Sequence, residues 1–215
     1  MSKNFLTVLL FAVVVFLSFY SVWRISQPRV LSQDEMKVNG FYQYGSFEEL
    51  RDFKLIDHNG NNFTKENFTS NDLNFLYFGY SSCPTECPVM MSVMKQVYEK
   101  IETDKIAYFL VSFDPEIDTL DRLKNYVTAF NPDFIGLSGE ISEVVKLGYQ
   151  LGVEKLAPME NHMKQRVISH TNHLIVVNKK GEVIGIFKAP FESSNMALVI
   201  KSLLCLLYTS DAADE

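Results

Sequence analysis

Cysteine is scarce in this chain of 215 residues, which contains only Cys83, Cys87 and Cys205. A closed structural zinc site is excluded, because zinc in such a site needs four ligands, commonly two cysteine pairs, and there is no second pair. The scarcity makes the spacing of Cys83 and Cys87 in "YFGYSSCPTECPVMM" the first feature that needs an explanation.

Clusters of Lys and Arg are also missing, and the formal net charge is −6. Phosphate binding requires a basic stripe, so nucleic acid is excluded as the main partner. The remaining composition is near the average for globular proteins and allows one domain of ordinary size plus an appendage.

Charge is absent from Asn4 to Trp23, after a short tail of residues 1–4. Residues 5–23 at about 1.5 Å each span roughly the 30 Å core of a bilayer. No small-x-small cleavage site is obvious and no cysteine follows to carry a lipid, which favours an uncleaved transmembrane signal anchor. Lys3 precedes the predicted anchor, and Arg24 and Arg29 follow it. The positive charges on its two sides are nearly balanced, so charge alone does not determine the orientation of the anchor in the membrane.

The last eleven residues, "CLLYTSDAADE", resemble an in-frame translation of a sequencing-library adapter. We therefore exclude residues 205–215 from the predicted domain. The alternative is a natural disordered tail, and resequencing the locus distinguishes the two.

The middle of the chain alternates strand and helix patterns. Residues 24–45 are polar without a clear period and are predicted to be a linker, and residues 46–204 form the domain. A hairpin is predicted around "DHNGNN", with His58 solvated in its turn. The later runs predict strand–helix–strand–helix–strand–helix, a second hairpin and a final helix. This order predicts an α/β, thioredoxin-like mixed sheet with helices on both faces and an N-terminal β-hairpin.

The two thiols lie where a buried strand is predicted to meet a helix. Helix N-terminal N–H groups favour the thiolate, which is the nucleophile of disulfide exchange and the form that binds metal. The three-residue gap between Cys83 and Cys87 allows either a disulfide or convergence on one soft cation. A purely structural disulfide and two inert buried thiols are the alternatives.

Histidine and methionine offer further ligands. His170 and His173 precede a predicted strand that could lie beside the dithiol, and spacing does not separate them. The loop "APMENHMKQR" contains Met159, His162 and Met163, whose thioethers and imidazole could form an auxiliary copper contact, although a loop without a metal role is the simpler interpretation.

Three ordered motifs resemble the Sco/SenC family of copper proteins: "FGYSSCPTECP", "VSFDPEIDTLDRLKNYVTAF" and "ISHTNHLIVVNKKGEVIGIF". The likeness covers about residues 47–204. It implies that Cys83, Cys87 and His170 bind copper as Cu(I) and Cu(II), with His173 as a neighbour. Ser169 stands where the family usually has Asp. Asp114 corresponds to a family aspartate and is expected near the site, where it could also cap a turn before Pro115.

The resemblance implies a membrane-anchored metallochaperone that delivers copper to the dinuclear copper site of cytochrome c oxidase during assembly. Its partners would be the copper-accepting oxidase subunit and other copper or thiol carriers, and it would sit in the inner membrane as a single-pass protein with its domain in the periplasm.

Two other function classes compete with the metallochaperone. A thiol-disulfide reductase would act through Cys83 and Cys87 on the oxidase subunit or another extracytoplasmic protein, and it would not need His170. A peroxiredoxin-like peroxidase shares the expected architecture, but the Cys-Pro dithiol is not its nucleophile pattern.

Overall fold

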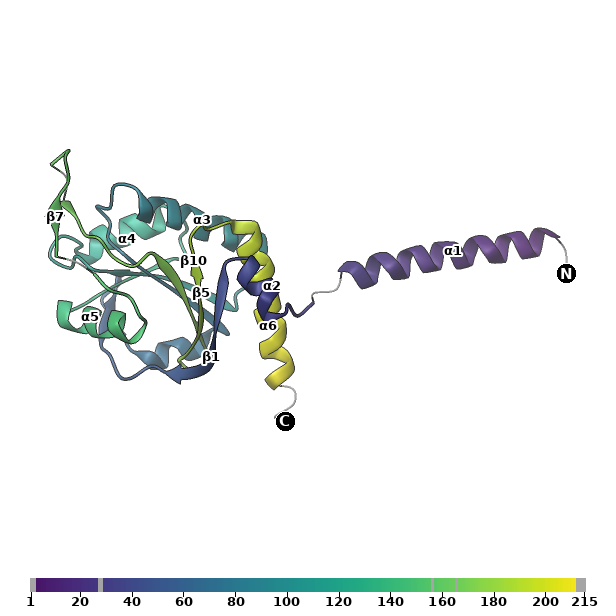
Figure 1. The fold of residues 1–215 in the computed structure, drawn as a ribbon, viewed down its shortest axis with the longest axis horizontal. Helices are drawn as coiled ribbons and strands as arrows, with labels where there is room; N and C mark the ends of the chain where they lie inside the picture. Colours follow the sequence, from purple (N-terminus) through teal and green to yellow (C-terminus); the bar gives the residue numbers. More distant parts are fainter. Residues whose placement is uncertain (1–2, 27–28, 156, 165, 212–215) are drawn as a thin grey trace. The chain divides into compact units, whose positions relative to one another are not determined.

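The computed structural model describes residues 3–26, 29–155, 157–164 and 166–211 (Figure 1). It divides the chain into two compact units, Met1–Val30 and Leu31–Glu215. In the first unit the structure describes one helix, α1 (Lys3–Ser26), and the apolar side chains whose exposure is described are exposed. Over the described residues, no helix combines the length and hydropathy needed to cross a membrane. Membrane crossing by residues 5–23 therefore stays a prediction.

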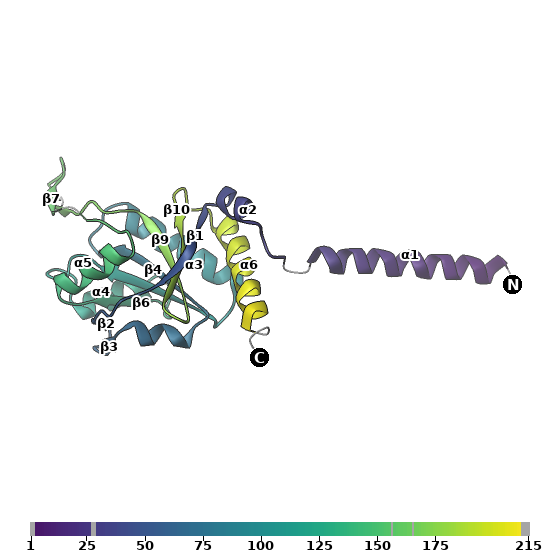
Figure 2. The same ribbon diagram turned by 60° about the horizontal axis from the view of Figure 1, so that its bottom comes forward.

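The second unit is built on a mixed sheet of eight strands in the order β1-β10-β9-β4-β5-β6-β2-β3 (Figures 1 and 2). β4, β5 and β6 are parallel, and the other pairings are antiparallel. The strands are β1 (Phe41–Glu49), β2 (Leu55–Asp57), β3 (Asn62–Phe63), β4 (Leu73–Gly79), β5 (Ile106–Ser112), β6 (Ile135–Ser138), β9 (His173–Asn178) and β10 (Glu182–Lys188). A separate pair, β7 (Met159–Glu160) and β8 (Arg166–Val167), forms a small hairpin.

Helices cover both faces of the sheet. The remaining elements are α2 (Gln33–Val38), the 3-10 helix η1 (Lys65–Ser70), α3 (Glu86–Ile101), α4 (Leu120–Thr128), α5 (Ile141–Gln150) and α6 (Ser193–Asp211). One core cluster contains buried residues of α2, α3, α4 and α6, and a second contains those of α5 and η1. Every residue of β4 is buried, because this strand is covered on both sides. The predicted mixed α/β sheet with flanking helices is confirmed.

The segment predicted as a linker contains regular structure. Residues 33–38 form α2, which begins with a capping box between Ser32 and Glu35, and Met36 is buried. β1 begins at Phe41 and pairs with β10 at the edge of the sheet. Six residues are too few to show a helical period, and an edge strand can be polar on one face, so the sequence pattern did not predict either element.

The first predicted hairpin is confirmed as β2 and β3, but the prediction for its histidine is wrong. His58 is only 8% exposed. Its ring Nδ1 accepts a hydrogen bond of 3.0 Å from Gly136 N, and the backbone N–H of His58 donates to Gly136 O at 2.9 Å. His58 therefore connects the β2–β3 hairpin to β6 through these two hydrogen bonds. Burial of the imidazole lowers the pKa of His58.

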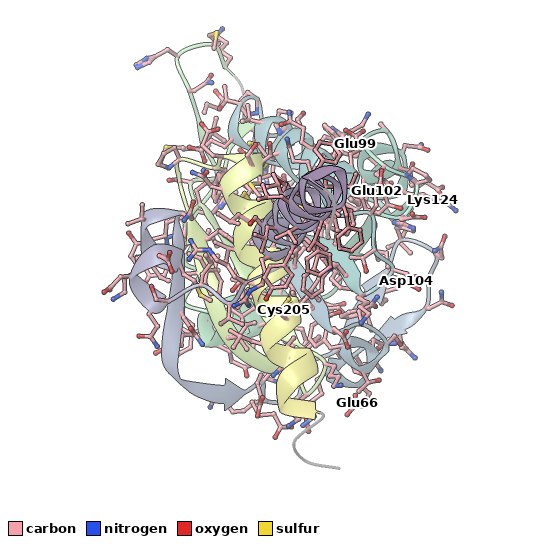
Figure 3. All side chains as sticks on the ribbon, turned by 90° about the vertical axis from the view of Figure 1, so that its right-hand side faces the viewer. Glu66, Glu99, Glu102, Asp104, Lys124 and Cys205 are labelled. Carbon is pink, nitrogen blue, oxygen red and sulfur yellow. The ribbon has the colours of Figure 1, made fainter. Side chains whose placement is uncertain are left out.

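The last helix extends beyond the predicted domain. α6 runs to Asp211, and Cys205 lies on it as a half-buried free thiol (Figure 3). The proposal that residues 205–215 are an adapter translation stays a prediction.

Candidate metal centre

Cys83 and Cys87 lie between the end of β4 and the first turn of α3. We call residues 80–87 the dithiol loop. Cys87 is fully buried as the second residue of α3, whereas Cys83 is half-exposed in the loop before it. Both thiols are free, and Cys87 N donates to Cys83 Sγ at 3.4 Å. The sulfur of Cys83 therefore lies at the helix N-terminus, as the sequence predicted.

The pKa values of the two thiols are shifted in opposite directions. A hydrogen bond from the Cys87 thiol, together with backbone N–H groups at the start of α3, lowers the pKa of Cys83 to about 5. The same hydrogen bond and burial raise the pKa of Cys87. Near neutral pH the loop therefore presents a Cys83 thiolate next to a protonated Cys87, and this thiolate is both a nucleophile and a soft metal ligand.

Gly79 allows the buried thiol to approach the strand. A Cβ placed on Gly79 would lie 2.8 Å from Cys87 Sγ and 3.2 Å from a methyl group of Leu110. Both distances are shorter than ordinary van der Waals contacts. The Phe-Gly-Tyr sequence that ends β4 therefore has a packing reason, which is the space occupied by the sulfur.

Two buried tyrosines, Tyr77 and Tyr80, connect the thiols with His170. Their rings meet the imidazole edge-on, with centroids at 6.2 and 6.4 Å, and Phe113 lies 5.7 Å from it. Burial is the main cause that raises the pKa of Tyr77, with a contribution from the charges of both thiols, and it raises the pKa of Tyr80 to about 12. Both phenols therefore remain neutral hydrogen-bonding groups at the site.

His170 presents one ring nitrogen for a ligand. Its Nδ1 lies 3.0 Å from Thr171 O, and a carbonyl oxygen only accepts, so Nδ1 carries the hydrogen. In the neutral ring Nε2 then has a free lone pair. A backbone carbonyl that fixes the tautomer in this way is typical of histidines that bind metals.

The structure does not assemble the three predicted ligands into one compact group. Within the described ranges, no set of three or more His, Cys, Asp or Glu side chains is close enough together to hold a metal ion. Cys83, Cys87 and His170 instead share the neighbours Tyr77 and Tyr80. Their role as a ligand set stays a prediction.

His170 belongs to the segment that follows α5 and leads into β9, residues 154–171, which we call the imidazole arm. Its base is closed by the bridge between Lys155 and His170 and by a 2.9 Å hydrogen bond from Thr171 N to Glu154 O. Ile168 N donates to Tyr80 Oη at 3.0 Å, which joins the arm to the dithiol loop. His173 lies outside the arm, at the start of β9, where it pairs with Lys188 of β10.

Asp114 anchors the arm to β5. Its carboxylate is 2% exposed and accepts two hydrogen bonds from Arg166, at 3.1 Å from Nε and 2.8 Å from Nη2. Its backbone carbonyl accepts from Ile117 N and Asp118 N, which closes the turn that follows. The side chain thus pairs with the arm, and the backbone makes the turn.

Asp118 is a residue that the sequence interpretation missed. It is 1% exposed and accepts hydrogen bonds from Ser81 N at 3.0 Å, from the Ser81 hydroxyl and from the Ser112 hydroxyl at 2.6 Å. It therefore ties the dithiol loop to β5 and α4. The only signal was its place in "DPEIDT", directly before the α4 N-cap Thr119.

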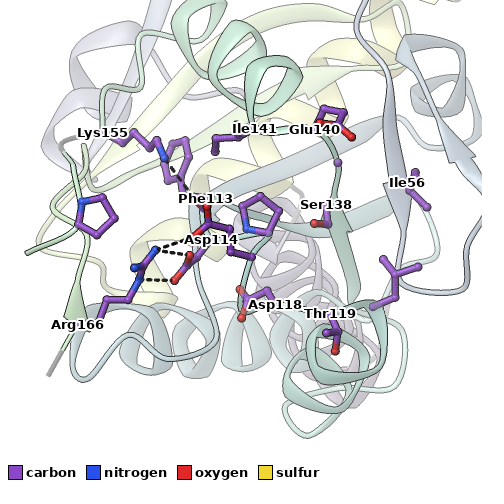
Figure 4. Close-up of a pocket in the computed structure, with 15 residues that line it drawn as sticks. Ile56, Phe113, Asp114, Asp118, Thr119, Ser138, Glu140, Ile141, Lys155 and Arg166 are labelled. Atoms are coloured by element: carbon purple, nitrogen blue, oxygen red, sulfur yellow. Dashed lines mark hydrogen bonds and ion pairs between the residues drawn. The ribbon is translucent and has the colours of Figure 1, made fainter.

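A cleft of about 660 Å³ opens beside these anchors (Figure 4). Phe113, Asp114, Lys155 and Arg166 line one side, and Ser138, Glu140 and Ile141 line another. Phe113 is therefore a residue that both lines the cleft and lies next to the His170 ring.

A sequence model described as SCO1/SenC matches residues 43–205. The chain belongs to the SCO1/SenC family. The match begins within β1 and includes the dithiol loop, Asp114 and His170, so the family assignment covers the whole site.

Named relatives agree with this assignment. Yeast protein SCO2, mitochondrial, is 30% identical over 164 residues, which are 74% of this chain and 54% of the yeast protein, so the chain spans about half of that relative. Copper-bound ScoI of Bradyrhizobium japonicum has a TM-score of 0.64 at 26% identity and covers 72% of this chain and 98% of that one. BsSco is described as a member of the Sco family of cytochrome c oxidase assembly proteins with a disulfide switch. Its structure has a TM-score of 0.55 at 19% identity, and the match covers 75% of this chain and 98% of BsSco. At this identity the likeness supports the fold alone.

Proposed function

We propose that this protein is a copper carrier that supplies copper to cytochrome c oxidase during assembly. The observation that carries the proposal is the pair of free thiols beside the start of α3, which share the neighbours Tyr77 and Tyr80 with His170. Two sulfurs and one imidazole suit Cu(I), and imidazole also suits Cu(II). The copper-bound relative at 26% identity supports this proposal, and the oxidase as acceptor is what the resemblance to the Sco/SenC family implies.

Capture and release would occur by exchange of ligands. At neutral pH, binding to both sulfurs would displace the proton of Cys87, because Cys83 is already a thiolate. The His170 imidazole would then complete the site by a shift of the imidazole arm. An acceptor's thiolates or thioethers would replace the three ligands one at a time, with no change in the oxidation state of the metal.

The test is a Cu(I) titration of the full-length chain in mild detergent, without oxygen and against a competing chelator. We expect Cys83→Ser to abolish tight binding and His170→Ala to weaken it by about tenfold or more. His173→Ala is the matched control, since this histidine is three positions away but belongs to the sheet. Equal affinity in the parent and His170→Ala would remove His170 from the ligand set.

A second candidate function, thiol-disulfide exchange, is favoured by one specific observation. The pKa of about 5 for Cys83, with Cys87 beside it as a resolving thiol, is the arrangement of a dithiol reductant. Reduction of a mixed-disulfide peptide should then survive His170→Ala and be lost in Cys83→Ser. If instead both variants lose the activity together, the reaction is not simple thiol exchange through Cys83.

We also propose that residues 5–23 hold the chain in the inner membrane, with the domain on the periplasmic side. The support is the uncharged run in the sequence and the exposure along α1 of Phe11, Phe16 and Phe19, at 71%, 68% and 73%. Protease added to intact spheroplasts should degrade the domain. A domain that is protected until the membrane is broken would place it on the other side.

A further inference from the structure

The β7–β8 hairpin is the part of the imidazole arm farthest from the sheet. Figures 1 and 2 both show it extending away from the body of the second unit. Its turn has defined geometry: Met163 N donates to Asn161 Oδ1 and Lys164 N donates to Asn161 O, both at 2.9 Å. Lys164 adopts a φ of 58°. Met159 precedes this turn, and His162 and Met163 lie within it.

The methionines of the hairpin are unlike the others that the structure describes. Met159 and Met163 are 55% and 74% exposed. The remaining described methionines are all at most 2% exposed and belong to the core: Met36, Met90, Met91, Met94 and Met196. Methionine is a core residue in most proteins, so two exposed thioethers in one short hairpin, with an exposed imidazole between them in sequence, have no packing explanation.

These three side chains have the chemistry of a soft-metal site. Thioethers are uncharged and carry no proton, and they select Cu(I) over harder ions, while neutral imidazole is a ligand for copper in either state. A site of two thioethers and one imidazole would bind Cu(I) more weakly than two thiolates do, because it adds no negative charge. Such a site can therefore load and unload readily.

The position of the hairpin connects it to the predicted centre. The chain passes Lys155 after α5, forms the hairpin and reaches His170 before β9, and Lys155 and His170 bridge each other. Arg166 of β8 is paired with Asp114, and Ile168 is bonded to Tyr80. The exposed thioethers thus lie at the outer end of the imidazole arm, and His170, the predicted imidazole ligand, lies at its base.

We propose that Met159, His162 and Met163 form an accessory Cu(I) site at the tip of the hairpin, separate from Cys83 and Cys87. The role of this site as a point where copper is loaded or released rests on the proposed copper-carrier function. The binding of Cu(I) to the three side chains does not depend on that function. The bonds involved are metal–sulfur and metal–nitrogen bonds only, and no electron or proton is transferred.

The experiment uses the full-length chain in mild detergent, with its methionine methyl groups labelled with ¹³C, in a Cys83→Ser/Cys87→Ser background that removes the dithiol. Cys205→Ser is included in this background, because Cys205 is a further free thiol. Cu(I) is added as an acetonitrile complex without oxygen, and the methyl resonances are followed. We expect the Met159 and Met163 signals to shift together and saturate at one Cu(I), while the signals of the buried methionines stay in place. Met159→Leu and Met163→Leu assign the signals, and Met90→Leu is the matched control in the core.

The triple variant Met159→Leu/His162→Ala/Met163→Leu in the same background should bind no Cu(I) in the range where its parent saturates. These side chains are exposed, so we expect the far-ultraviolet circular dichroism of the two proteins to agree. Binding that persists in the triple variant, or methyl signals that do not move with Cu(I), would overturn the accessory site.

A titration of the chain with Cys83 and Cys87 restored separates this inference from the proposed function. Two Cu(I) per chain, the weaker lost in the triple variant, is the expected result. One tight Cu(I) that the triple variant retains would leave the dithiol centre intact and overturn the hairpin site. One weak Cu(I) that the triple variant loses would support the hairpin site and contradict the proposed dithiol carrier.

Discussion

The dithiol loop and the imidazole arm contribute to one predicted centre, but the fold holds them in different ways. The dithiol loop lies between a strand buried along its whole length and a helix of the core, and Asp118 fixes its backbone at Ser81. The imidazole arm is held at its base by the Lys155–His170 bridge and by two side-chain anchors, Asp114–Arg166 and Tyr80–Ile168. The sulfurs are therefore fixed between core elements, whereas the imidazole depends on a few contacts between residues far apart in the sequence.

This difference bears directly on how a carrier could work. A site whose ligands were all rigid would bind metal tightly and release it slowly. Here the predicted nitrogen ligand lies on the arm, which can open locally if the bridge at its base and these two anchors are released. We infer that the sulfurs retain the metal and that the arm controls access, and four experiments test this division.

The largest effect is expected from removing the anchor of the dithiol loop. Asp118→Ala leaves Ser81 N and the Ser112 hydroxyl buried without their acceptor, and this should lower the free energy of unfolding by about 3 kcal/mol. Urea denaturation measures it. The exposed Asp121 is the matched control, and Asp121→Asn should change stability by less than about 0.5 kcal/mol. Equal stability of the two variants would show that the core does not fix the loop through Asp118.

A smaller effect on stability is expected from crowding the buried sulfur. Gly79→Ala places a methyl group 2.8 Å from Cys87 Sγ, against a strand and a helix that are both packed, so we expect a loss of about 2 kcal/mol. Gly45→Ala is the control, because a Cβ at Gly45 meets no atom within 4 Å. A thermal midpoint for Gly79→Ala as high as that of Gly45→Ala would contradict a rigid dithiol loop.

The sequence predicted the features that depend on neighbouring residues, and these include the dithiol loop. The dithiol at a strand–helix junction follows from local signals: an apolar run, two prolines and a helical period. β4, α3 and the hairpin of β9 and β10 were predicted for the same reason, since each is encoded within about fifteen neighbouring residues.

Contacts between distant residues were not predictable in this way. Arg166 reaches Asp114 across 52 positions, and Ser81 reaches Asp118 across 37. His58 was predicted to be solvated from its turn sequence, yet β6 buries it, because its partner Gly136 lies 78 positions away. The pattern of residues within one segment does not show which distant residue will contact it. The contacts that anchor the site, Arg166–Asp114 and Ser81–Asp118, were therefore found only in the structure.

Loosening the imidazole arm should leave global stability nearly unchanged and act locally. Arg166→Gln removes the bidentate pair with Asp114, and thermolysin should then cleave residues 154–171 faster than in the parent. Lys164→Gln is the control, because Lys164 is exposed and makes no anchor to β5. Alkylation of Cys83 should be the same in both variants. Cleavage at the parental rate in Arg166→Gln would mean that the arm is held by its base alone.

The smallest perturbation is a change of pH, which tests the asymmetry within the dithiol loop itself. Only a thiolate reacts with iodoacetamide, so the alkylation rate of Cys83 should rise with pH through a midpoint near 5 and level off well below neutrality. Cys87 should stay unmodified over this range, because burial and the hydrogen bond to Cys83 raise its pKa. Peptide mapping by mass spectrometry separates the two. A Cys83 midpoint near the ordinary value for a cysteine would contradict the stabilised thiolate, and the initial metal contact would then have to come from the imidazole arm.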